Sequence, residues 1–273
     1  MEILQRYYDD GVPSNRQLFY EGGFVAMAST GFAYLLFPDE ISLVSVCLAA
    51  IACSDSVERL LRWNQRIISD QTFTPPQANA RLTQRLFWLF IGVMVGFAAL
   101  GMALPVDSVQ QVFAHQVADY GDVAFPSIHF GTFGRLIHHN LYVLLFFLLV
   151  GIPFRQGGVL FAVVWNASVW GPTFALLARR WAEQPDAPHS AMAFVYVIAA
   201  TLPHLALEAG AYLLAGFSGV LLSQGIARHR WSSAQLSAIL RSVFAMLVLG
   251  LVLMTLGALW EAQVAPVLVK ILT

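Results

Sequence analysis

One acidic residue lies deep inside a long apolar segment of this sequence. Glu208 falls within residues 190–222, whereas the other Asp and Glu residues lie in polar connections or near the ends of apolar segments. A carboxylate near the middle of a membrane costs about 2.5–3.5 kcal/mol on insertion scales. We therefore expect Glu208 to face the interior of a helix bundle, next to a polar partner.

His204 is the nearest group that could serve this carboxylate. It precedes Glu208 by four residues, so a helix places both side chains on one face, and Tyr212 extends that face by another turn. The spacing predicts a polar site inside the membrane made of His204, Glu208 and Tyr212.

The same segment carries residues that shape a helix. Pro203 removes one helical hydrogen bond and crowds the preceding turn, which predicts a kink. Gly216 and Gly219 follow the polar residues and predict close packing of a neighbouring helix.

Asn140 and Asn166, each in a different apolar segment, are the expected partners for this face. Three uses remain open: hydrogen bonds that hold the bundle together, a path for protons or ions, and a metal site. His-x-x-x-Glu supplies at most two metal ligands, so zinc would need a third, from His138 or His139. We predict no catalytic residue and no cofactor.

The composition identifies the environment of these residues. Of 273 residues, 58% are hydrophobic and 11% are charged, with a mean hydropathy of +0.67. A soluble domain of this size cannot bury so much apolar surface. The net charge of −1 provides no basic field for nucleic acid. These values predict an all-α, polytopic transmembrane helix bundle whose main partner is the lipid bilayer.

Seven apolar segments predict the spans. The first two are short and are expected to form a tilted or re-entrant hairpin, which would leave five full spans if it does not cross. We expect two parts: residues 1–85, with this hairpin and a cytoplasmic amphipathic helix, and residues 86–273, the bundle core. The seven segments are Phe24 to Phe37, Ile41 to Cys53, Leu86 to Leu104, Leu136 to Phe154, Val159 to Ala178, Ser190 to Leu222 and Leu236 to Trp260.

Arginine placement predicts the orientation. With the N-terminus cytoplasmic, eleven of the fifteen basic residues lie inside, as the positive-inside rule favours. We therefore expect a multi-pass protein of the inner (plasma) membrane with its C-terminus periplasmic and no cleaved signal peptide. The eleven are Arg6, Arg16, Arg59, Arg62, Arg66, Arg81, Arg85, Arg155, Arg228, Arg230 and Arg241.

Two connecting segments offer surfaces for protein partners. Residues 57–68 place apolar side chains on one helical face and arginines off it, which predicts a helix lying on the cytoplasmic membrane surface. Residues 105–135 carry Val109, Val112, Phe113 and Val117 at helical spacing, followed by Tyr120, Phe125, Phe130 and Phe133. We expect a short helix on the outer face, available to a periplasmic or membrane partner.

The stretch from Asn140 to Gly219 resembles the stage II sporulation protein M family of integral membrane proteins. The resemblance rests on an Asn opening one span, glycines at the next turn, an Asn in the next span, and a Pro-His-x-x-x-Glu signature with a trailing Ala-Gly-x-x-Gly. These are Asn140, Gly151, Gly157, Gly158, Asn166, Gly171, Pro203, His204, Glu208, Ala215, Gly216 and Gly219.

Two positions depart from the family pattern: Ala167 follows Asn166, and Leu205 follows His204, where members carry glycine. The resemblance implies a non-enzymatic membrane component of an envelope-associated complex, without showing a role in sporulation. The alternative is a transporter or channel for a small solute or ion that uses the His204 and Glu208 site.

Overall fold

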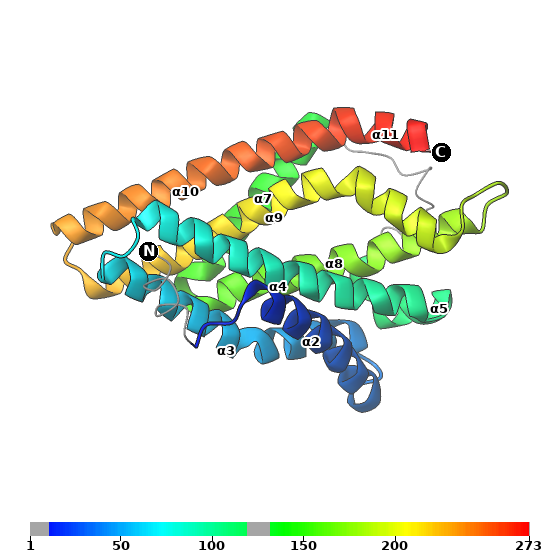
Figure 1. The fold of residues 1–273 in the computed structure, drawn as a ribbon, viewed down its shortest axis with the longest axis horizontal. Helices are drawn as coiled ribbons and strands as arrows, with labels where there is room; N and C mark the ends of the chain where they lie inside the picture. Colours follow the sequence, from blue (N-terminus) through cyan, green and yellow to red (C-terminus); the bar gives the residue numbers. More distant parts are fainter. Residues whose placement is uncertain (1–10, 119–131, 273) are drawn as a thin grey trace.

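The computed structural model describes residues 11–118 and 132–272 of the chain. All regular elements in these ranges are helical, and they pack into an elongated bundle (Figure 1). The helices are α2 (Asn15–Leu36), α3 (Ile41–Ser69), α4 (Pro75–Ala103), α5 (Val106–Val112), α6 (Ala114–Val117), α7 (Phe133–Phe154), α8 (Gln156–Ala182), α9 (Ser190–Arg228), α10 (Ala234–Leu259), the π-helix η2 (Trp260–Val264) and α11 (Ala265–Leu272).

The predicted all-α polytopic bundle is confirmed, although the number of long apolar helices differs. Six of the described helices are long and apolar enough to cross a membrane: α3, α4, α7, α8, α9 and the continuous α10–α11 arm. The expected first span, α2, is not among them. Its first two turns contain Arg16, Gln17 and Glu21, which lower its hydropathy.

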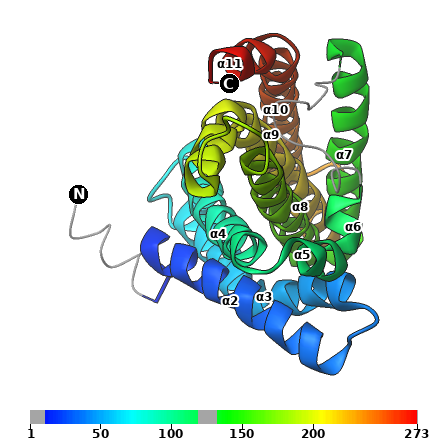
Figure 2. The same ribbon diagram turned by 90° about the vertical axis from the view of Figure 1, so that its right-hand side faces the viewer.

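α8 occupies the centre of the bundle. Figure 2, a view along the long axis of the bundle, shows α8 between α4, α9 and α7, with α2 lying obliquely across one side; α3 also packs against α8. In the most apolar 18 residues of α8, 78% is buried inside the protein, a larger share than in any other candidate span of the described residues. Arg179 near its end donates hydrogen bonds to the carbonyl oxygens of Gly101, at 2.9 Å, and Leu104. These bonds satisfy carbonyls left free where α4 ends.

The helix expected at residues 57–68 is present but is not an element of its own, because this segment continues α3 without a break. The polar residues that suggested an end are satisfied by side-chain contacts: Ser56 Oγ donates to Glu21 Oε1 at 2.6 Å, and Arg59 pairs with Asp55 at 2.9 Å. The apolar face, with Val57, Leu60, Leu61 and Ile67, is buried against the rest of the protein.

Close contact between glycines and neighbouring backbone holds α2 against α4. A Cβ atom at Gly22 would lie 2.7 Å from the Leu89 carbonyl oxygen, and one at Gly96 would lie 2.8 Å from Ala26 Cβ. A Cβ at Gly92 would meet the backbone of Phe19. The small residues of α4 are therefore used for internal packing.

The predicted outer helix corresponds to the two short helices α5 and α6. Val109, Val112, Phe113 and Val117 are all buried. Gln116 Nε2 donates to the Ser42 carbonyl at 3.2 Å, which ties α6 to the start of α3. The expected aromatic residues Tyr120, Phe125 and Phe130 lie outside the described residues, and Phe133 begins α7.

Candidate functional site: a buried Asn–Glu contact

A single polar contact joins α7 to α9 inside the bundle. Asn140 Nδ2 donates a hydrogen bond of 2.5 Å to Glu208 Oε1. Only 4% of Asn140 and 7% of Glu208 is exposed. The structure therefore places the one acidic residue predicted to be intramembrane beside one of its two expected asparagine partners.

A glycine crossing sets the register of this contact. A Cβ atom at Gly219 would lie 2.8 Å from Gly151 Cα, so α7 and α9 approach each other at their backbones. Asn140 and Glu208 are 68 positions apart in sequence, and so are Gly151 and Gly219. Both contacts thus belong to one parallel register, eleven residues or about three helical turns apart. The residues that allow close packing also align Asn140 with Glu208.

α10 closes the third side of the site through glycines. A Cβ at Gly257 would lie 3.2 Å from Glu208 Cγ and 3.4 Å from the His204 carbonyl oxygen. About one turn later along α9, towards the glycine crossing, a Cβ at Gly250 would lie 3.5 Å from the Ala211 carbonyl oxygen. Glu208 is therefore enclosed by α7, α9 and α10.

The sequence analysis missed a second acidic residue at this site, Glu261. It directly follows the last predicted apolar segment, which ends at Trp260, but the helix continues through η2 into α11. Glu261 lies close enough to Glu208 and Tyr212 to interact electrostatically with both. π-Turns within α-helices occur often at functional sites, but no sequence pattern marks this one in advance.

Of the other residues predicted to form the site, some lie close to Glu208 and one does not. Tyr212 is buried one turn from Glu208 and packs against Phe147, with 5.5 Å between ring centroids. His204 Nδ1 is buried with no hydrogen-bond partner. Asn166 does not join the site, because its Nδ2 donates to the Ala162 carbonyl of its own helix at 2.8 Å.

Pro203 lies inside α9, as predicted. Proline leaves the carbonyl four residues earlier, at Ala199, without its helical donor. The next carbonyl along the helix, that of Ala200, accepts a hydrogen bond of 3.3 Å from Trp260 Nε1. A side chain of the α10–η2 arm therefore supplies a donor at the weakened turn, as commonly happens around prolines in membrane helices.

Gly216 and Gly219 differ in how closely they are packed. A Cβ at Gly216 would be 3.4 Å from its nearest neighbour, the Gly158 carbonyl oxygen, which is an ordinary contact. A Cβ at Gly219 would overlap the backbone of α7. Of these two glycines, only Gly219 is required for the present helix spacing.

The metal-site hypothesis finds no ligand cluster in the described parts of the chain. No group of three or more His, Cys, Asp or Glu side chains comes together there. His138 and His139 are exposed, and the His138 ring packs edge-on against Tyr142 at 4.7 Å. Neither was found to join His204 and Glu208.

These features define a polytopic α-helical membrane protein with one enclosed polar contact among three helices. The chain belongs to the stage II sporulation protein M family, whose model matches residues 85–266. The match extends well beyond the stretch that first suggested the family and contains Asn140, Glu208 and Glu261. No curated protein and no solved structure matches the chain.

Proposed function

We propose that this protein is a non-enzymatic component of an envelope-associated membrane complex, in which the Asn140–Glu208 contact fixes the relative positions of three helices. The protein would lie in the inner membrane with a cytoplasmic N-terminus and a periplasmic C-terminus, as the arginine distribution favours. This orientation needs α2 to cross as a seventh span, because the six described helices that qualify by length and hydropathy would leave both termini on one side. The periplasmic ends of the helices, near α5, would then be available to partner proteins.

The enclosure of Glu208 is the observation that supports this proposal. The carboxylate accepts a hydrogen bond from Asn140 and contacts α10 at Gly257. A groove of about 360 Å³ borders α9, but Glu208 is not among the residues that line it. A carboxylate enclosed in this way suits a fixed helix contact better than a hydrated transport path.

A transport function for a small solute or ion remains the alternative, and Glu261 favours it. A buried carboxylate that interacts electrostatically with a half-buried one in a π-turn resembles the acidic relays of pumps and transporters. In this alternative, Glu208 would exchange a proton or ion during each transport cycle.

Replacement of Glu208 separates the two functions. Glutamine keeps an oxygen that can accept from Asn140 but cannot ionise, whereas leucine removes the acceptor. If the contact is structural, we expect Glu208→Gln to fold normally and Glu208→Leu to lower the yield of folded protein. Liposomes containing the purified protein and a proton-sensitive dye then measure flux.

The transport alternative would be favoured if wild-type protein conducts protons or ions and well-folded Glu208→Gln does not.

Membership in a complex is measured separately. Extraction from native membranes with mild detergent, after cross-linking, should give a particle larger than any formed by the purified chain alone. Equal masses in the two preparations would contradict a complex with other proteins.

A further inference from the structure

A groove lies between α4, α9 and α10, and Glu208 is not among the residues that line it. Its volume is about 360 Å³, within the range of small-ligand sites. Asn79 and Ala80 line it from α4, Gly210 from α9, and Ser242, Ala245 and Leu253 from α10. Because three membrane-spanning helices form its walls, the molecules that reach it most readily are lipids.

The lining combines an apolar trough with a few polar groups, which suits an amphiphile. Asn79 is 6% exposed, and its Oδ1 accepts from Asn64 Nδ2 at 3.0 Å. Its own Nδ2 donates only to Met246 Sδ at 3.6 Å, and a thioether is a weak acceptor. An ester carbonyl of a lipid would be a stronger acceptor for this buried amide.

The end of the bundle where α9 meets α10 carries basic residues. Arg228, Arg230 and Arg241 are all exposed, and the sequence has no Asp or Glu between Glu208 and Glu261. Arg241 directly precedes Ser242, which lines the groove. Its Nη1 donates to Ser237 Oγ of its own helix at 3.0 Å. A lipid chain in the groove would thus have arginines near its headgroup.

We propose that this groove binds an anionic phospholipid, with an acyl chain along α4 and α10 and the phosphate beside Arg241. Basic residues next to a membrane attract anionic headgroups, each by about 1 kcal/mol. The groove supplies apolar contact for the acyl chain, and Asn79 supplies a hydrogen-bond donor for the ester carbonyl. The proposal does not depend on the function of Glu208.

Native mass spectrometry of the full chain in detergent, titrated with phosphatidylglycerol or phosphatidylcholine, tests this site. We expect one phosphatidylglycerol to bind more tightly than phosphatidylcholine. Ala245→Trp, which fills the groove from an exposed position, should abolish that binding. The control Val252→Trp changes a 49% exposed residue of the same helix outside the groove and should leave binding intact.

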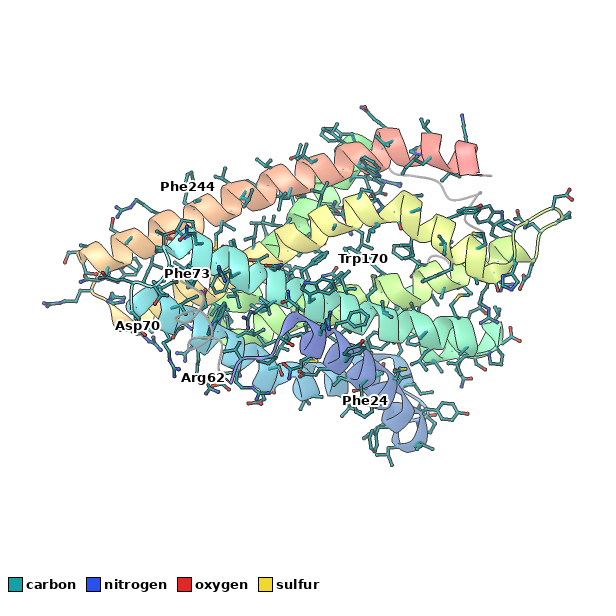
Figure 3. The ribbon with its side chains drawn as sticks, viewed as in Figure 1. Phe24, Arg62, Asp70, Phe73, Trp170 and Phe244 are labelled. Atoms are coloured by element: carbon teal, nitrogen blue, oxygen red, sulfur yellow. The ribbon has the colours of Figure 1, made fainter. Side chains whose placement is uncertain are left out.

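A second pair of variants tests the headgroup. Arg241→Gln should weaken phosphatidylglycerol binding about fivefold, the factor that corresponds to about 1 kcal/mol per arginine, and leave phosphatidylcholine unchanged. Arg62→Gln is the control, because Arg62 lies on α3, on the other side of the bundle from Phe244 of α10 (Figure 3).

Two outcomes would overturn the proposal. One is equal lipid binding by Ala245→Trp and Val252→Trp; the other is equal affinity for the two lipids in wild-type protein. If Ala245→Trp elutes as aggregate, Ala80→Trp fills the groove from the α4 wall and replaces it in the same comparison.

Discussion

Replacement of Gly219 by alanine should force α7 and α9 apart, whereas the same change at Gly216 should not. The two glycines lie on the same helix, three residues apart, and both are buried. A Cβ at Gly219 would lie 2.8 Å from Gly151 Cα and 3.0 Å from Gly151 C, and would overlap the Leu148 carbonyl oxygen. All three neighbours are backbone atoms, so no side-chain rotation can relieve the overlap.

The size of the effect follows from the comparison of the two variants. Alanine in a helix is about 1 kcal/mol more favourable than glycine, and this gain applies at both positions and cancels. Overpacking of a filled site costs about 1–3 kcal/mol. At Gly216, where the nearest atom is 3.4 Å away, the added methyl group fits with little movement. Gly219→Ala should therefore be about 1–3 kcal/mol less stable than Gly216→Ala.

Equilibrium unfolding in mixed micelles of dodecyl maltoside and SDS, followed by circular dichroism, measures this difference. The predicted gap corresponds to a factor of about 5–150 in the unfolding equilibrium. If the two variants unfold at the same SDS fraction, α7 and α9 do not cross at Gly219. In that case the register that aligns Asn140 with Glu208 would also be wrong.

Three further predictions concern the contacts around the site, each measured by the same unfolding assay. Asn140→Leu should cost about 1–3 kcal/mol, because it leaves Glu208 without the donor described above, and Glu208→Leu in the same chain should recover part of that loss. Gly257→Leu should destabilise more than Gly257→Ala: a Cβ there would lie 3.2 Å from Glu208 Cγ, so alanine requires only a small shift of the Glu208 stem, whereas leucine must displace it. Arg179→Met should cost about 1–3 kcal/mol by removing the donor to Gly101 and Leu104, and limited proteolysis should then cleave near residue 105 faster.

Composition alone was enough to predict the class of fold, and the scarcity of buried charge identified Glu208. The sequence offers two asparagines, Asn140 and Asn166, as partners of Glu208, but it does not indicate which of them makes the contact. Asn166 has the same side chain and lies further inside its own apolar segment. The difference is that Asn166 finds an acceptor in its own helix, and that choice depends on the rotation of α8, which hydropathy does not determine.

The ends of helices were the least predictable feature. A run of Ser and Asp residues at 54–56 suggested that the second segment stops near Cys53, yet α3 continues to Ser69. The polar groups there are satisfied by Glu21 of another helix and by Arg59. Likewise, the apolar run appeared to end at Trp260, whereas η2 and α11 extend it and carry Glu261 into the site. The first error arises because tertiary partners can satisfy polar residues inside a helix, and the second because the π-turn that continues the helix has no sequence signature.

The energetics argue that Glu208 is not present for stability alone. Placing a carboxylate in the membrane costs about 2.5–3.5 kcal/mol, whereas hydrogen bonds between membrane helices average about 0.6 and reach about 1.7 kcal/mol. The bond from Asn140 therefore does not offset the cost, and a leucine pair would pack at lower cost. The polar pair instead favours one register of α7 against α9 over others, because a shift of one turn at the glycine crossing would leave both side chains without their partner. Glutamine would serve this purpose equally well, so a defect specific to Glu208→Gln would show that ionisation itself is used.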